Sequence, residues 1–162
     1  MKHNTSSTIK FISGGEELLP KIEPLWKLLN EHHANVSRFF SEDFLSFSFE
    51  RRIAKFKKEY QQGKLRVDIA VEQQFPIGYI IGGIRKDNIG EIESIFILET
   101  HRNMSIGEKL MNHCIRWLRS AGVDNILVKV AVGNEAVLPF YEQFGFFPRV
   151  YTLKRRMHQE YG

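Results

Sequence analysis

The sequence predicts a mixed α/β domain, and two patterns support that fold class. A largely apolar stretch at 92–98, typical of a buried strand, runs into a strongly periodic helical stretch at 106–121. Before it, residues 65–71 alternate between apolar and polar and residues 75–84 are largely apolar, which favours two strands joined as a hairpin. The expected order is β-α-α-β-β-β-α-β-α-β-β, which clusters the strands in the middle of the chain.

Shorter patterns predict the remaining elements. Alternation at 8–12 indicates a first strand, and Ser13 with Glu16 has the spacing of a capping box that begins a helix ending near residue 30. A second helical pattern at 50–62 is followed by Gly63, a residue type that commonly ends helices. The later elements are a strand at 126–132, a helix from about 134 to 144, and a last strand or strands at 150–157.

The composition is that of an ordinary globular protein. The 162 residues are 43% hydrophobic and 26% charged, which suits one domain, residues 1–162, around a single core. No apolar run approaches the roughly 18 residues needed to span a bilayer. The first residues lack the apolar centre of a signal peptide. We therefore expect a cytoplasmic protein with no membrane partner.

The net charge of +4 favours an anionic partner, yet the basic residues are scattered along the chain. Short clusters such as Arg51-Arg52 and Lys154-Arg155-Arg156 are expected on solvated faces. A nucleic-acid surface would show interleaved aromatic residues or a longer basic stripe, and the sequence has neither. A phosphate-rich small molecule fits this charge better than a nucleic acid does.

The residue types that most often carry metals or nucleophilic chemistry offer little here. The single cysteine, Cys114, falls on the apolar side of the 106–121 helix, so we expect a buried hydrophobic residue and not a nucleophile. His32 and His33 are adjacent, point to opposite sides of a helix, and have no accompanying Cys, His or Asp set. We expect no metal site.

The turn between the 92–98 strand and the 106–121 helix is where an anion could bind. The first turn of a helix leaves backbone N–H groups unpaired and carries roughly half a positive charge, and the turn adds a glycine and an arginine that suit a phosphate. A competing interpretation is a capping box, in which Ser105 and Glu108 satisfy those same N–H groups. The turn consists of Arg102, Asn103, Met104, Ser105, Ile106 and Gly107.

The spacing Arg102-x-x-Ser105-x-Gly107, followed by Asn134 and by Phe140-Tyr141-x-x-x-Gly145-Phe146, resembles the GNAT superfamily of N-acetyltransferases. That family's pyrophosphate signature is Arg/Gln-x-x-Gly-x-Gly/Ala, so Ser105 stands where the family has its first glycine. The resemblance implies a central, mostly antiparallel, twisted sheet of six to seven strands flanked by about four helices. It also implies acetyl-CoA as co-substrate.

The resemblance implies a general base at Glu93, because the family often places a glutamate in this strand to draw a proton from the amine. Holding a lysine-like amine of pKa about 10.4 neutral at pH 7 costs about 4.6 kcal/mol, so a base would help. Burial among Ile92, Ile95 and Ile97 would make the Glu93 carboxylate a stronger base. The alternative is that Glu93 only anchors a salt bridge, and Glu91 and Glu99 lie close enough in sequence to compete for the role.

Tyr141 matches the family's tyrosine that protonates or hydrogen-bonds the departing thiolate, although it could simply pack on its helix. Asn134 matches the family's asparagine that contacts the pantetheine arm, and it also stands where a helix needs an N-cap. The backbone of Ile97 and Leu98 would pair with the pantetheine amides as an added strand does. The expected cofactor-binding residues are Ile97, Leu98, Arg102, Asn103, Met104, Ser105, Ile106, Gly107, Glu108, Asn134 and Phe140.

These inferences predict an acetyl-CoA-dependent N-acetyltransferase that transfers the acetyl group directly to a primary amine in a ternary complex. Two alternatives stay open: a CoA or acyl-CoA sensor without turnover, and a protein that binds another phosphate ligand. The acceptor is expected to be a small-molecule or peptide amine, but the sequence does not identify it. It also does not show whether other acyl groups are used or whether the protein forms a homodimer. A phenylalanine-rich stretch at 39–49 suggests an acceptor with an apolar part.

Overall fold

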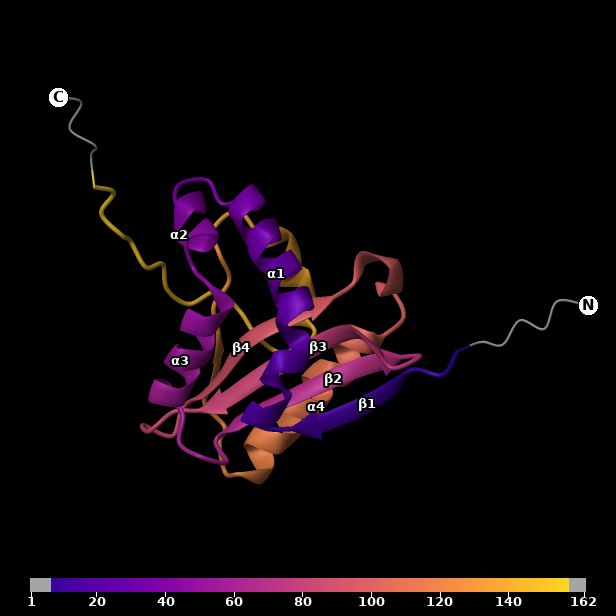
Figure 1. Ribbon diagram of the computed structural model, residues 1–162. Coiled ribbons are helices and arrows are strands. Elements are labelled where there is room, and N and C mark those ends of the chain that lie inside the picture. The colour runs from indigo at the N-terminus through magenta and orange to yellow at the C-terminus, as the bar shows by residue number, and fades with distance from the viewer. Residues whose placement is uncertain (1–6, 158–162) are drawn as a thin grey trace, which may run out of the picture.

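The computed structural model describes residues 7–157, which form a single sheet with helices on both faces (Figure 1). Strands β1 to β4 are antiparallel to their neighbours, whereas β5 runs parallel to β4. The strands lie in the order of the chain: β1 (Lys10–Gly14), β2 (Leu65–Glu72), β3 (Phe75–Ile84), β4 (Gly90–Ile97) and β5 (Ile126–Val128).

The helices form two layers. In Figure 1, α1 and α3 cross the front of the sheet and α4 lies behind it. Helix α4 has the longest uninterrupted amphipathic pattern, and its apolar side faces the sheet. The α-helices are α1 (Leu19–Val36), α2 (Ser41–Leu45), α3 (Phe49–Glu59), α4 (Ile106–Ser120) and α5 (Leu138–Glu142), and short 3-10 turns are η1 (Glu16–Leu18), η2 (Glu99–His101) and η3 (Glu135–Val137).

The core is divided by the sheet into two halves. On the α1 and α3 side, Trp26, Phe56 and Tyr79 pack with the inward residues of β2 and β3. On the α4 and α5 side, Leu110 and Tyr141 pack against the other face of the same strands. Strand β3 is buried from Ile77 to Ile84, because it is covered on both faces.

Two glycines let both layers approach β3 closely. A Cβ at Gly83 would lie 2.2 Å from the Tyr60 ring, and one at Gly82 would lie 2.4 Å from the Cys114 sulfur. Larger residues at these positions would push Tyr60 or Cys114 away from the sheet. Gly83 therefore helps to place Tyr60, which reaches the candidate site described below.

The predicted fold class is confirmed, but within residues 7–157 the sheet has five strands and not six to seven. The strand expected at 126–132 is regular only at Ile126–Val128, and the strand expected at 150–157 is not formed. A strand needs a hydrogen-bonded neighbour, and residues 146–157 run away from the sheet (Figure 1).

Three predicted helix boundaries are also wrong. The first long helix, α1, ends at Val36 and not near residue 30. The Ser13 hydroxyl donates to Asp68 on β2, so the capping box with Glu16 does not form. Helix α3 ends at Glu59, before Gly63, because Tyr60 already has an extended backbone. None of the helices within residues 7–157 is long and apolar enough to cross a bilayer.

Candidate active site

The edge of β4 that faces β5 opens part-way along its length. Gly90, Glu91 and Ile92 pair with β5, and in the described part of the chain the pairing ends there. From Ser94 to Ile97, β4 pairs only with β3 on its other side, and Glu93 has no partner in either neighbouring strand. This leaves backbone groups of β4 available to an extended ligand, which could add to the open edge as a further strand does.

A β-bulge lies where β4 and β5 separate. Ile81 of β3 pairs with Ser94 and Gly82 pairs with Ile92, so Glu93 is the extra residue. The bulge changes the alternation of β4: Ile92 and Ile95 belong to the α4 half of the core, whereas the Ser94 hydroxyl bonds Tyr79 of the other half. Glu93 is thereby directed towards α3.

The Glu93 carboxylate is held by two side chains of the α3 region. Its Oε2 accepts from Arg52 Nη2 at 2.9 Å, and its Oε1 accepts from the Tyr60 hydroxyl. Arg52 Nη2 also donates to the Glu93 carbonyl at 3.1 Å. The Glu93 side chain is 7% exposed and that of Arg52 15% exposed. Glu93 thus sits in a polar network and not among the isoleucines expected from the sequence.

Arg52 and Tyr60 are the site residues that the sequence did not indicate. The Arg51-Arg52 pair was expected on a solvated face, which is wrong for Arg52, since it forms the ion pair with Glu93. Burial and the hydrogen bond to Glu93 raise the pKa of Tyr60 well above its ordinary value, so its hydroxyl stays a donor. No local pattern signals either residue, because their partner is 41 and 33 positions away.

The two other acidic residues near the strand have different surroundings. Glu91 is buried, and its carboxylate pairs with Lys129 at 2.8 Å and with Arg85 at 3.7 Å. It lies where β4 and β5 are still paired. Glu99 is exposed in η2, beyond the end of the strand. Glu93 is therefore the glutamate that stands at the opening itself.

The turn before α4 has the backbone shape of an anion cradle. Asn103 and Ser105 have φ of 62° and 59°, in the left-handed region that favours glycine. Ser105 makes no capping hydrogen bond, so the predicted alternative of a capping box is not formed. Within residues 7–157, the N–H groups from Asn103 to Glu108 have no protein acceptor, since the first bond of α4 joins Lys109 N–H to Ser105.

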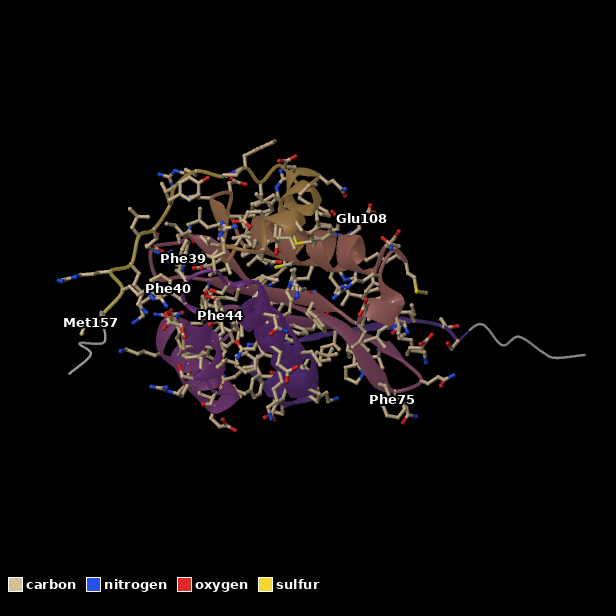
Figure 2. The ribbon with its side chains drawn as sticks, turned by 90° about the horizontal axis from the view of Figure 1, so that it is seen from above. Phe39, Phe40, Phe44, Phe75, Glu108 and Met157 are labelled. Carbon is tan, nitrogen blue, oxygen red and sulfur yellow. The ribbon has the colours of Figure 1, made fainter. Side chains whose placement is uncertain are left out.

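Side chains around this turn are tied to β4 or point outward. Arg102 Nε donates to the carbonyl of Ile97 at 3.3 Å, which ties the turn to the end of β4. Met104 is half exposed, and Glu108 points outward on α4 in Figure 2. The turn and the open edge of β4 therefore form one continuous surface. A diphosphate fits these donors, because six N–H groups and a helix N-terminus are available to it.

Helix α5 approaches this surface from the other side of the opening. Phe140 lies against Gly107, where a Cβ would be 3.3 Å from the ring, and Ile97 also lies close to Gly107. Tyr141 is buried against Phe140 and Phe146. Its hydroxyl has no hydrogen-bond partner among the described residues, and burial raises the pKa of Tyr141 to about 12.

Asn134 does not cap the following turn, contrary to one of the two predicted roles. Its Oδ1 lies 3.0 Å from His32 Nε2, and this contact joins the loop after β5 to α1. Gly133 packs against the end of α1 so closely that a Cβ would lie 1.8 Å from the Val36 carbonyl oxygen. Arg38 adds an ion pair to Glu135 at 2.8 Å. The early helix and this loop thus form one wall beside the opening.

The other residues considered for chemistry are accounted for by packing. His32 bonds Asn134, and the His33 ring packs against Phe44 with the two planes tilted by 52°. Cys114 is fully buried, and burial raises the pKa of its thiol to about 12. Within residues 7–157 no group of three His, Cys, Asp or Glu side chains could hold a metal. A cavity of about 1080 Å³ lies between Gly14, Tyr60 and Trp117, and no residue of the turn lines it.

Comparison with known proteins places the chain in a family. The family model described as "Acetyltransferase (GNAT) family" matches residues 30–146, which include β4, the turn, α4 and α5. The chain belongs to the GNAT acetyltransferase family. This match covers most of the chain and includes both layers of helices.

Two curated proteins and one solved structure illustrate the relationship. N-alpha-acetyltransferase 50 of Danio rerio is 36% identical over 56 residues, which are 34% of this chain and 33% of that protein. An uncharacterized N-acetyltransferase of Methanocaldococcus jannaschii is 30% identical over 77 residues, 44% of this chain and 34% of that protein. The chain spans about a third of the length of the curated relatives it matches.

The solved structure is that of aminoglycoside N-acetyltransferase AAC(6')-Iy in complex with CoA. It superimposes with a TM-score of 0.69 at 17% identity, and the alignment covers 96% of this chain and all of that chain. At this identity the likeness supports the GNAT fold. The family membership of the chain rests on the match over residues 30–146.

Proposed function

We propose that this GNAT protein is an acetyl-CoA-dependent N-acetyltransferase that transfers the acetyl group directly to a primary amine in a ternary complex. The observation that carries the proposal is the junction of two features: the free N–H groups from Asn103 to Glu108, and the open edge of β4 that begins at Glu93. One suits a diphosphate and the other suits an extended arm.

The cofactor-binding residues divide by the part of acetyl-CoA that they would hold. The turn from Arg102 to Glu108 would bind the diphosphate through its backbone and the Arg102 side chain. The backbone of Ile97 and Leu98 would pair with the pantetheine amides. Phe140 forms the neighbouring wall, and Asn134 would contact the arm from the loop after β5. Bound acetyl-CoA supplies the activated acyl group as a thioester.

Glu93 would accept the proton of the incoming ammonium, directly or through a water. Arg52 and Tyr60 each donate one hydrogen bond to a different oxygen of the Glu93 carboxylate, and each oxygen has two lone pairs. The carboxylate therefore keeps acceptor capacity while its orientation is fixed by α3.

Tyr141 would donate a hydrogen bond to the departing sulfur. With its pKa raised to about 12 by burial and a thiol near 8.5, full proton transfer is uphill by about 5 kcal/mol. Because its pKa is raised to about 12, the hydroxyl stays protonated at neutral pH and is available as a donor. Cys114 is too buried to act as an acyl carrier, which supports direct transfer.

The acceptor is proposed only as a class, a small-molecule or peptide amine. The relatives differ in the acceptors that their names state: AAC(6')-Iy is an aminoglycoside N-acetyltransferase, and the Danio rerio protein is an N-alpha-acetyltransferase. The wall facing the opening includes the loop between α1 and α2, where Phe39 is 55% exposed. An acceptor with an apolar part beside its amine fits this wall.

Calorimetric titration with acetyl-CoA, followed by thiol release on an amine panel, tests the proposal. We expect Arg102→Ala to weaken acetyl-CoA binding about 10- to 100-fold, as the loss of a hydrogen bond to a charged group does. Arg116→Ala is the matched control. It removes an arginine that lies within α4 and not in the turn, and this variant should bind acetyl-CoA normally.

The outcomes separate the candidate functions. Binding with no thiol release from any amine would favour a CoA sensor. Failure to bind CoA or acetyl-CoA would favour another phosphate ligand. Unchanged affinity in Arg102→Ala would show that the turn is not the diphosphate site.

A further inference from the structure

The opening beside β4 presents a positive and a negative group next to each other. The Arg52 guanidinium and the Glu93 carboxylate form an ion pair there, so together they carry no net charge. Other charged side chains on the strands and loops around the opening are paired too: Glu91 with Lys129 and Arg85, and Arg38 with Glu135. A ligand that carries only a positive charge would therefore match only half of what it meets.

Arg52 keeps hydrogen-bond donors that the protein does not use. A guanidinium carries five N–H bonds, and Nη2 of Arg52 donates to the carboxylate and to the carbonyl of Glu93. The N–H groups on its Nε and Nη1 have no acceptor within residues 7–157. In that range, Nδ1 of His113 is the one side-chain polar atom that is buried without a partner, so these N–H groups of Arg52 are not sealed from solvent. Three donors of Arg52 are therefore open to a ligand.

The neighbours of Arg52 hold its guanidinium in place between α3 and α1. The Cζ atom lies 4.5 Å from the centre of the Phe56 ring, which supports one face of the guanidinium plane and leaves its edge for hydrogen bonds. Burial, with smaller contributions from the charges of His32 and Arg52, lowers the pKa of His33 to about 4, so His33 is neutral at pH 7. Arg52 is thus a positioned cation beside the candidate base.

We propose that the acceptor is a zwitterionic amine, an α-amino acid, whose ammonium group faces Glu93 while its carboxylate accepts from the free N–H groups of Arg52. In an α-amino acid the two charged groups are joined through a single carbon, and Arg52 Nη2 lies 2.9 Å from Glu93 Oε2. The two dipolar pairs can therefore align head to tail, with a charge-assisted hydrogen bond at each end. This acceptor class rests on the proposed function and narrows it.

Glu93 and Arg52 would have separate tasks in the transfer. Glu93 takes one proton from the ammonium and passes it to solvent, and the amine nitrogen then attacks the thioester carbonyl carbon. The C–N bond forms, the C–S bond breaks, and the second proton lost from nitrogen ends on the CoA sulfur as a thiol. The carboxylate of the amino acid is unchanged, so Arg52 binds it before and during the reaction. Its contact with the acceptor should therefore appear mainly in KM.

Thiol release from matched acceptors tests this assignment in the unaltered protein. L-leucine is compared with isoamylamine, which lacks only the carboxylate, and with L-leucinamide, which lacks its charge; L-phenylalanine is compared in the same way with phenethylamine and its amide. We expect kcat/KM to be about 10- to 100-fold higher for the amino acids, the effect of one hydrogen bond to a charged group. The amides have the amine of a peptide N-terminus, with a pKa of about 8, so a preference set by easy deprotonation would favour them instead.

Arg52→Gln tests where the carboxylate binds. We expect KM for L-leucine to rise about 10- to 100-fold, while KM for isoamylamine stays within about threefold. A purely structural role of Arg52 would change both acceptors alike. Arg51→Gln is the matched control, because Arg51 is the neighbouring, exposed arginine of α3, and it should keep the preference for L-leucine. If Arg52→Gln does not fold, the comparison of acceptors in the unaltered protein still decides.

The outcomes separate this acceptor class from the proposed function. Thiol release that is equal for the amines without a carboxylate, or faster with them, would overturn the amino-acid acceptor and leave the acetyltransferase in place. An unchanged KM for L-leucine in Arg52→Gln would overturn the role of Arg52. Acetyl-CoA binding with no thiol release from any amine would overturn both.

Discussion

The two layers of helices contact β4 in different ways. On the α4 side, the candidate site is made of consecutive backbone, from the end of β4 through the turn to Glu108. On the α1 and α3 side, it is made of side chains that meet from distant parts of the chain, such as Arg52 with Glu93 and His32 with Asn134. The first arrangement depends on local conformation and the second on tertiary packing. Substitutions should therefore act differently on the two sides.

The largest effect is expected at Glu93, where the α3 layer meets the opening. Glu93→Gln keeps the size of the side chain and one acceptor oxygen but removes the base. We expect kcat to fall about 10²- to 10³-fold with acetyl-CoA affinity little changed, since general-base catalysis contributes on this order. Glu99→Gln is the control because Glu99 is exposed beyond the strand, and it should retain full activity.

Coupling to Arg52 distinguishes a base from a structural ion pair. If Arg52 acts by orienting Glu93, Arg52→Gln should lower kcat on its own yet lower it no further in the Glu93→Gln background. Full activity in Glu93→Gln would show that Glu93 only anchors the ion pair. The same conclusion would follow if Arg52→Gln lowered kcat by the same factor in the unaltered protein and in Glu93→Gln.

A second large effect is expected where α1 packs on the loop after β5. Gly133 has φ of 105°, and an alanine Cβ there would meet the Val36 carbonyl oxygen at 1.8 Å. We expect Gly133→Ala to lower the free energy of unfolding by about 3 kcal/mol or more. Gly145 also has positive φ but open space around it, so Gly145→Ala should cost only about 1 kcal/mol. Equal losses in urea denaturation would contradict the close contact.

This difference between the layers also explains what the sequence could predict. The order of the elements and the turn before α4 follow from patterns within short windows, such as the apolar run ending at Ile97 and the periodicity of α4. The mistakes concern partners far away in sequence. Ser13 bonds Asp68 and not Glu16, and the expected strand at 150–157 has no neighbour in its own chain.

The candidate site shows the same division. Arg102, Ser105 and Gly107 could be identified from their spacing, because the cradle is a local structure. Arg52 and Tyr60 could not, because nothing near them in sequence shows that α3 lies over the bulge at Glu93. Whether Glu93 lies in apolar or polar surroundings depends on that packing, so its neighbours also could not be predicted.

A smaller effect concerns His33, which the α1 and α2 helices bury. Burial lowers the pKa of His33 to about 4, so the folded state binds its proton less readily than the unfolded state does. Between pH 6.5 and 4 the unfolded state therefore holds more protons, and stability falls as the pH is lowered. Allowing for its partial exposure, we expect a loss of about 1 kcal/mol between pH 7 and 5. Urea denaturation of His33→Gln should lack this component.

The smallest effect is expected in the turn, where backbone conformation should matter more than the side chain. Ser105→Gly relieves the strain of the left-handed backbone at φ 59°, but it also raises the conformational entropy of the unfolded chain. The net gain in stability should therefore be about 0.5 kcal/mol. Acetyl-CoA affinity should stay within about threefold, because the N–H groups are unchanged. Ser105→Val, whose branched side chain disfavours this φ, should lose both stability and affinity. A tenfold weaker affinity in Ser105→Gly would mean that the hydroxyl holds the diphosphate, and the cofactor side would then depend on a specific side chain just as the α3 side does.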